Sequence, residues 1–182
     1  MMSKSFSKIY LIGFMGSGKS YLSRNLSRLS GFPFVDLDEL IIERQKKSIN
    51  DIFQQFGEAF FRKEEASVLR HTEHWQKTII ACGGGTPCFG DNMDWMNRNG
   101  LSIFIDPDMQ VLLQRLQLGM DRRPLVKDKS LEEIQAFIET KMKERRPFYE
   151  KAHIHFQQKD PSLDAPKALW SLIQSHWKNQ SL

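Results

Sequence analysis

The chain has 182 residues, of which 40% are hydrophobic and 26% are charged, as is usual for one soluble globular domain with a single core. The formal net charge is +4 and the sequence pI is about 9.1, which suits anionic ligands. The basic residues are spread along the chain rather than gathered in a tail, so the composition gives no argument for a nucleic-acid partner.

The sequence also argues against zinc sites, disulfides and membrane insertion. The two cysteines, Cys82 and Cys88, have no histidine at zinc-ligand spacing and do not suggest a disulfide framework. No apolar stretch approaches the length that spans a bilayer. Lysines precede a short apolar run near the N-terminus, but this run leads straight into a loop that needs to stay attached, so we do not interpret it as a signal peptide. We therefore expect a cytoplasmic protein with free thiols.

The first predicted strand, 8–14, leads directly into the motif GFMGSGKS and a helix over 19–30. A glycine, four residues and then Gly-Lys-Ser, between a strand and a helix, is typical of a phosphate-binding loop. Glycines let backbone N–H groups approach phosphate oxygens, the lysine reaches the outer phosphates, and the serine hydroxyl is a ligand for Mg²⁺. A glycine-rich turn without a ligand does not explain this context. The predicted ATP-binding residues here are Gly13, Met15, Gly16, Ser17, Gly18, Lys19, Ser20 and Tyr21.

A second strand is predicted within 31–38, and it ends on the acidic pair Asp36 and Asp38. Alternation along a strand would place both carboxylates on one side, where they repel each other unless a cation or a hydroxyl lies between them. We predict that Asp36 holds hydrated Mg²⁺ through water, and that Asp38 accepts a hydrogen bond from a substrate hydroxyl and takes its proton. The alternative is that the pair caps the helix that follows.

The middle of the chain contains a run of glycines directly after a strand. Residues 48–75 are predicted to be helical, with Gly57 separating two helices, and a third strand over 77–82 ends at three consecutive glycines, 83–85. Such a run lets the backbone pass very close to a ligand; the alternative is a flexible turn. The next predicted elements are a helix over 91–100 ended by Gly100, a strand over 101–106, and a helix over 107–117 begun by Pro107.

The segment 118–130 is rich in basic residues and shows neither a helical nor a strand period, so we predict a mobile lid there. Arg123 lies in this lid beside a proline, which suits an arginine that closes on a transferring phosphoryl group. Planar guanidinium groups also hold carboxylates well, although most helical arginines face solvent. The last predicted elements are a helix over 131–152 interrupted by Pro147, a strand over 153–158 and a helix over 164–179.

Strands that alternate with helices predict an α/β fold with a mainly parallel sheet and helices on both faces. Ligands bind beyond the carboxyl ends of the strands in such sheets. We therefore expect the phosphate loop, the acidic pair, the glycine run and the basic loop to meet at one edge. We interpret 1–182 as a single domain, in which helices at about 39–75 bind the acceptor and 118–130 forms the lid.

The segments GFMGSGKS, FVDLD, FGEAFFRKEE, CGGGT, RRPL and RRPFY closely resemble those of the shikimate kinase family, in the family's order, from Lys8 to about Gln158. The resemblance implies a three-layer P-loop NTPase fold of the nucleoside-monophosphate-kinase type, with a central five-stranded parallel sheet. It implies transfer of the γ-phosphate of ATP to the 3-hydroxyl of shikimate, on the route to chorismate and the aromatic amino acids, with Mg²⁺ as cofactor. We expect a monomer whose partners are shikimate and ATP.

Matching motif to motif, the resemblance gives each candidate residue a role. Asp38 would bind ring hydroxyls and act as the base, Lys19 and Arg123 would contact the γ-phosphate, and Arg115 would contact adenine. Glu65, one helical turn after Arg62, would hold that arginine. The residues implied to bind shikimate are Asp38, Arg62, Gly83, Gly84, Gly85 and Arg145, with Phe53 and Phe61 as an apolar wall.

Three alternatives share the phosphate-binding loop. A gluconate kinase should not need the FR segment with its downstream glutamate together with the glycine run. A nucleoside monophosphate kinase would carry a DG-x-P-R segment of the adenylate kinase type, which this sequence lacks. A regulatory nucleotide-binding module would leave FVDLD and the arginines unexplained.

Overall fold

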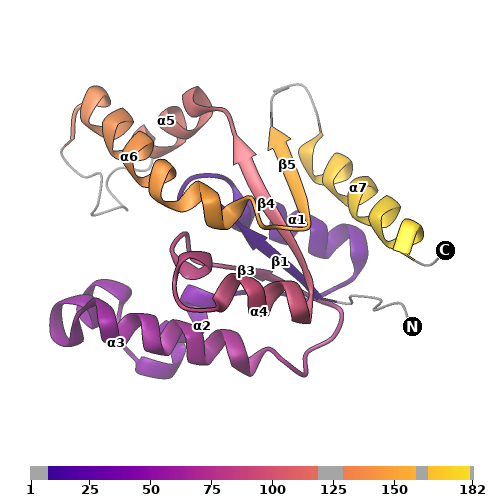
Figure 1. The fold of residues 1–182 in the computed structure, drawn as a ribbon, viewed down its shortest axis with the longest axis horizontal. Coiled ribbons are helices and arrows are strands. Elements are labelled where there is room, and N and C mark those ends of the chain that lie inside the picture. Colours follow the sequence, from indigo (N-terminus) through magenta and orange to yellow (C-terminus); the bar gives the residue numbers. More distant parts are fainter. Residues whose placement is uncertain (1–7, 119–128, 159–163, 181–182) are drawn as a thin grey trace.

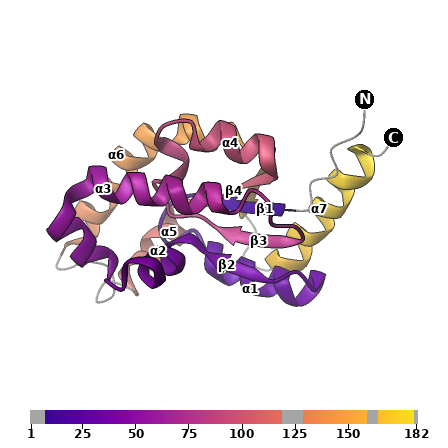
Figure 2. The ribbon, with the colours of Figure 1, turned by 90° about the horizontal axis from the view of Figure 1, so that it is seen from below.

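The computed structural model describes residues 8–118, 129–158 and 164–180. Most of the predicted lid, including Arg123, lies outside these residues. Within them, the chain forms a central sheet with helices on both faces, as Figure 1 and Figure 2 show. The predicted α/β architecture is therefore confirmed.

The sheet has five strands in the order β2-β3-β1-β4-β5, and every neighbouring pair is parallel. The central strand β1 is buried along its whole length and is apolar after its first residue, Lys8, as expected for a strand covered on both faces. The strand bounds are β1 Lys8–Ile12, β2 Phe34–Asp36, β3 Thr78–Ala81, β4 Leu101–Pro107 and β5 Ile154–Gln158.

The helices form two layers, one on each face of the sheet, and each layer packs on its own hydrophobic cluster. Side chains of β1 alternate between the layers: Tyr10 and Ile12 pack with helices α2 to α6, whereas Ile9 and Leu11 pack with α1 and α7. None of the described helices combines the length and the apolar character needed to cross a bilayer. The helix bounds are α1 Lys19–Ser30, α2 Leu37–Gln45, α3 Ile49–His71, the 3₁₀ turn η1 Thr86–Cys88, α4 Asn92–Asn99, α5 Met109–Gln117, α6 Leu131–Tyr149 and α7 Ala165–Gln180.

The helix breaks predicted at two glycines are confirmed, whereas the helix start and the helix interruption predicted at two prolines are wrong. Gly57 has non-helical angles (φ 77°, ψ 173°) and divides α3 into two helical parts. Gly100 ends α4. Pro107 does not begin a helix, because its register opposite Gln158 in β5 makes it the last residue of β4. Pro147 does not interrupt α6: although it removes one backbone donor, the helix continues to Tyr149 and the Glu150 N–H still donates to the Arg146 carbonyl at 2.9 Å.

Candidate active site

The carboxyl ends of the parallel strands lie at one edge of the sheet, and the predicted motifs follow three of them. The phosphate-binding loop follows β1, the acidic pair follows β2, and the glycine run follows β3. A Cβ atom at Gly84 would lie 3.4 Å from the backbone N of Met15, so the glycine run touches the phosphate-binding loop. The convergence that the sequence predicts is confirmed for these motifs.

The phosphate-binding loop has the backbone shape that its glycines permit. Gly13 has φ +141°, and a Cβ atom there would lie 2.5 Å from the carbonyl oxygen of Ile105, so no other residue fits. The Lys19 ammonium donates hydrogen bonds at 2.8 Å to the carbonyls of Gly13 and Phe14, which keeps it against the loop. Since α1 begins at Lys19, the positive end of its dipole faces the same space. This is the arrangement that binds phosphate groups.

A wide cleft of about 1440 Å³ opens on the outer side of this loop. Arg115 projects from α5 and donates to the Ser17 carbonyl at 2.9 Å and to Gln158 Oε1 at 3.3 Å, so it joins the loop to the end of β5. Tyr21 is on the rim of the cleft and is 61% exposed. The cleft is large enough for a nucleotide beyond the phosphates, and its further lining residues include Asn25, Arg28, Asp108, Gln114, Ala165, Pro166 and Lys167.

The acidic pair is arranged differently from the prediction. Strand β2 stops at Asp36 and α2 begins at Leu37, so Asp38 lies in the first turn of a helix and not beside Asp36 on a strand. The reason is that Asp36 caps α2: its Oδ1 accepts a hydrogen bond from the Asp38 N–H at 3.0 Å. Its other oxygen accepts from the Ser20 hydroxyl at 3.2 Å, so Asp36 is both a helix cap and a partner of the phosphate-binding loop.

Asp38 is a half-buried carboxyl group among other charges. Burial, and then the nearby carboxylates of Asp36 and Glu65, raise the pKa of Asp38 from 3.8 to about 6, while Lys19 and Arg62 oppose this rise. A carboxylate with a pKa nearer to neutrality is a stronger base than an ordinary aspartate. Asp38 therefore has the chemistry of a proton acceptor at the edge of the sheet.

The glycine run is packed against the charged groups, which contradicts the alternative of a flexible turn. A Cβ atom at Gly83 would lie 3.0 Å from Asp38 Oδ1, and one at Gly84 would lie 3.4 Å from Arg145 Nη1. At Gly85 it would lie 2.7 Å from Arg62 Nη1. A side chain at Gly83 or Gly85 would therefore crowd Asp38 or Arg62, whereas a Cβ atom at Gly84 would make only an ordinary contact.

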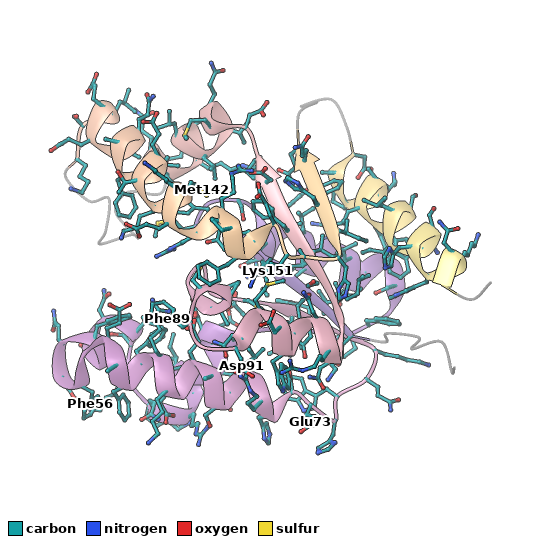
Figure 3. All side chains as sticks on the ribbon, in the orientation of Figure 1. Phe56, Glu73, Phe89, Asp91, Met142 and Lys151 are labelled. Atoms are coloured by element: carbon teal, nitrogen blue, oxygen red, sulfur yellow. The ribbon has the colours of Figure 1, made fainter. Side chains whose placement is uncertain are left out.

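Arg62 is held on three sides. Glu65, which is 1% exposed, accepts from Arg62 Nη1 at 2.8 Å, and Glu58 accepts from Nη2 at 3.1 Å. The ring of Phe89 lies 4.0 Å from the guanidinium carbon, and Figure 3 shows this side chain between α3 and α6. Glu65 lies where the helical spacing predicted it, whereas Glu58 and Phe89 were not predicted. Glu58 precedes Arg62 by one turn of α3, a spacing that makes ion pairs, so the sequence carried that signal.

Arg145 and Arg146 are neighbours on α6 with different surroundings. Arg146 forms an ion pair with Asp106 at 3.0 Å. Arg145 lies against the glycine run and over Phe14, and it has no ion-pair partner among the residues that the structure describes. The rings of Phe53 and Phe61 on α3 pack against each other with their centroids 4.6 Å apart, and Phe61 is buried. The site thus combines Arg145, which has no carboxylate partner among the described residues, with Arg62, which is held by Glu65, and with the basic carboxylate of Asp38.

The sequence model of the shikimate kinase family matches residues 15–172. The chain belongs to the shikimate kinase family. The shikimate kinase of Parabacteroides distasonis is 39% identical over 149 residues, which cover 82% of this chain and 86% of that protein.

Solved structures of shikimate kinases have the same fold. The Bacteroides thetaiotaomicron enzyme superimposes with a TM-score of 0.87 at 34% identity, over 93% of this chain and 99% of that one. The Acinetobacter baumannii enzyme, solved in complex with shikimate, superimposes with a TM-score of 0.82 at 28% identity, over 99% of both chains. The five-stranded, nucleoside-monophosphate-kinase-like fold is therefore confirmed.

All the site residues that the resemblance to shikimate kinases assigned lie in the described part of the chain, except Arg123. They form two groups at the edge where the strands end. Lys19, Ser20 and Arg115 face the cleft, while Arg62 and Arg145 lie at the glycine run. Gln158, whose side chain meets Arg115, was not among the predicted residues; its position at the end of the last strand was the available signal.

Proposed function

We propose that this chain phosphorylates shikimate by the reaction of its family, with the roles assigned below. The γ-phosphate of ATP is transferred to the 3-hydroxyl of shikimate, giving shikimate 3-phosphate and ADP. The observation that carries the assignment is the glycine run, against which Asp38, Arg62 and Arg145 lie beside the phosphate-binding loop. A hydroxylated carboxylic acid needs both a base and cations, and this turn supplies them together.

On the acceptor side, Arg62 and Arg145 hold the carboxylate of shikimate through charge-assisted hydrogen bonds. Arg145 has no ion-pair partner among the described residues, and Arg62 is kept in place by Glu65 and Phe89. Asp38 accepts the hydrogen bond of the reacting hydroxyl. The polyol is thereby oriented with one oxygen toward the phosphate-binding loop, and this positioning is a large part of catalysis.

On the nucleotide side, the loop amides and the end of α1 bind the phosphates, and Lys19 neutralises the charge that develops on the γ-phosphoryl group. As the acceptor oxygen bonds to phosphorus, Asp38 takes the hydroxyl proton and the bond to the bridging oxygen of ADP breaks. Arg115 supports the nucleotide at the outer cleft. Arg123, in the segment outside the described residues, is proposed to approach the phosphoryl group.

Two side-chain oxygens, one from the first turn of α1 and one from the end of β2, fit a magnesium ion. The hydroxyl of Ser20 and the carboxylate of Asp36 face each other at 3.2 Å, and both are hard ligands of the kind that Mg²⁺ prefers. When bound with ATP, Mg²⁺ would neutralise phosphate charge. Ser20 would hold it directly and Asp36 through water. We further propose that 1–182 acts as one kinase domain, as a monomer in the cytoplasm, without nucleic-acid or membrane partners.

A coupled assay of ADP release tests the acceptor. ADP release with Mg-ATP is measured without an acceptor and with shikimate, gluconate or AMP in turn. We expect strong dependence on shikimate alone. Release that depends on gluconate or on AMP would reject the assignment and favour another kinase of this fold.

A further inference from the structure

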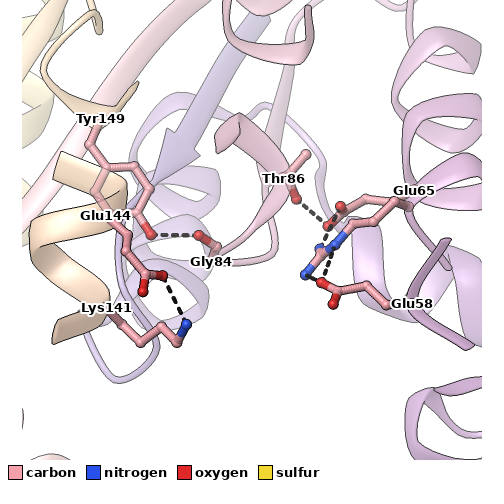
Figure 4. A network of polar contacts seen from close by, with 8 residues as sticks. Glu58, Glu65, Gly84, Thr86, Lys141, Glu144 and Tyr149 are labelled. Carbon is pink, nitrogen blue, oxygen red and sulfur yellow. Dashed lines mark hydrogen bonds and ion pairs between the residues drawn. The ribbon is translucent and has the colours of Figure 1, made fainter. Parts of the chain in front are cut away.

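The glycine run is tied to the helices on both sides of it by two hydroxyl groups. Thr86, directly after the run, donates to Glu65 on α3, and Tyr149, at the end of α6, donates to the carbonyl of Gly84. Figure 4 shows the two contacts on opposite sides of the same turn. Neither hydroxyl touches Asp38 or the phosphate-binding loop in the described contacts.

Thr86 is the inner end of a buried chain of contacts that leads to Arg62. Its side chain is completely buried, and its hydroxyl donates to Glu65 Oε1 at 2.6 Å. The other oxygen of Glu65 accepts from Arg62 at 2.8 Å. Because the Thr86 N–H also donates to the Gly83 carbonyl at 3.1 Å, the threonine is fixed to the turn by its backbone. The carboxylate of Glu65 therefore fixes the Arg62 guanidinium relative to the glycine run.

Tyr149 makes the equivalent connection for Arg145. The tyrosine is completely buried and its ring packs on Phe104 of β4 with centroids 5.0 Å apart, so it has little freedom. The Arg145 guanidinium lies beside its hydroxyl. Burial raises the pKa of Tyr149, so the hydroxyl keeps the proton that it donates to Gly84.

We propose that Thr86 and Tyr149 are positioning residues for acceptor binding: they anchor the helices that carry Arg62 and Arg145 to one backbone turn and so set the spacing of the two guanidinium groups. The inference rests on the proposed function, since it concerns how the carboxylate of the acceptor is held. A carboxylate bound by two arginines requires both at the correct separation, and small displacements weaken such a contact strongly.

Isosteric removal of each hydroxyl tests this role, and the chain offers a matched control for each. The test variants are Thr86→Val and Tyr149→Phe. The controls are Thr78→Val and Tyr10→Phe, which remove buried hydroxyls that donate to Gln76 or contact Thr72 near the opposite end of the sheet. KM for shikimate, KM for ATP and kcat are measured for all four.

We expect Thr86→Val to raise the KM for shikimate about ten-fold and Tyr149→Phe about three- to ten-fold, the range that one lost buried hydrogen bond produces. The KM for ATP and kcat should stay within about two-fold of the wild type in both. Thr86→Ser keeps the hydroxyl and should restore the KM for shikimate. In the double variant the increase should be clearly smaller than the product of the two single increases, because both residues set one spacing.

Several results would overturn the inference. These are a normal KM for shikimate in both variants, equal increases in the two controls, or a double variant that shows the full product of two independent effects. Partial unfolding of a variant does not obscure the result, because KM does not depend on the amount of active enzyme. If the wild type fails to phosphorylate shikimate, the proposed function fails and this inference with it. If the wild type is active and both variants bind normally, only the inference fails.

Discussion

The two sides of the active edge are built in different ways. On the nucleotide side, the groups proposed to bind phosphate lie in one continuous segment, as backbone groups around Gly13 and the start of α1, next to an open cleft of about 1440 Å³. On the acceptor side, α2, α3 and α6 each supply a side chain, and these surround one turn after β3. In the proposed function, the first side binds phosphate through the main chain, and the second binds the acceptor through charged side chains.

This difference predicts how each side responds to substitution. Substitution of a side chain at the outer cleft, such as Arg115, cannot remove the backbone donors proposed to bind phosphate, so it should weaken ATP binding only modestly. On the acceptor side, each recognition group is one side chain, and its loss removes a whole contact. The following predictions test whether substitutions on one side change the KM of only one substrate.

The largest expected effect is on turnover in Asp38→Asn. The amide keeps the shape of the side chain but cannot take a proton, so kcat should fall by about 10²–10⁴-fold. The KM for ATP should remain near that of the wild type. Steady-state kinetics with both substrates provide the measurement, and Asp91→Asn, a surface carboxylate that pairs with Arg70, is the control. Turnover within about ten-fold of the wild type would remove Asp38 as the base.

The same variant should be more stable than the wild type at neutral pH. The pKa of Asp38 is raised to about 6 from 3.8, so between these values the folded chain binds more protons than the unfolded chain. The ionised group therefore costs stability above about pH 6, by up to about 3 kcal/mol, and this cost disappears below about pH 4. Denaturant unfolding at about pH 7.5 and about pH 4 should show a gain in Asp38→Asn only at the higher pH. An equal gain at both pH values would contradict the raised pKa.

Next in size are the effects of Arg62→Ala and Arg145→Ala. Each removes a charge-assisted contact worth about 1.5–3 kcal/mol, so the KM for shikimate should rise by about 10–100-fold while the KM for ATP changes little. Arg70→Ala, on the same helix as Arg62, and Arg146→Ala, next to Arg145, are matched controls with partners elsewhere. An unchanged KM for shikimate in both test variants would show that the arginines do not hold the acceptor.

The smallest expected effect is that of Arg115→Ala on the nucleotide side. Loss of its hydrogen bond to the Ser17 carbonyl should raise the KM for ATP by about three- to ten-fold. The KM for shikimate should not change. Arg24→Ala, an exposed position on α1, is the control. If Arg115→Ala raised both KM values equally, the two sides would not be separable as we describe them.

The contrast between the sides also explains what could be predicted from the sequence. The phosphate-binding loop is local, and its glycines and lysine are adjacent in the chain, so the motif alone defines it. The parallel sheet follows from the alternation of strands and helices. Asp38 was predicted to be a proton acceptor from the acidic pair itself, whereas the carboxylate-binding roles of Arg62 and Arg145 came from the resemblance to a family. The structure then showed that all three lie at the glycine run.

The remaining features depend on contacts between distant segments. Thr86 meets Glu65 across 21 residues, and Tyr149 meets Gly84 across 65, and no sequence period encodes either pairing. Pro107 is typical of a helix start, but pairing with β5 keeps it in the strand. The acidic pair was misplaced because two local preferences compete there, and the capping of α2 by Asp36 prevails over continuation of the strand.

The shielding of Glu65 from water has a consequence for how acceptor preference can change. Arg62 is the cation that neutralises this carboxylate, so its replacement by an uncharged residue leaves a negative charge stranded in the interior, at a cost of about 3–5 kcal/mol. Folding thus constrains Arg62 independently of any ligand. Arg145 neutralises no carboxylate among the described residues, so its replacement should not leave a buried charge unpaired. Substitutions that change which acid the enzyme binds should therefore be tolerated more readily at Arg145 than at Arg62.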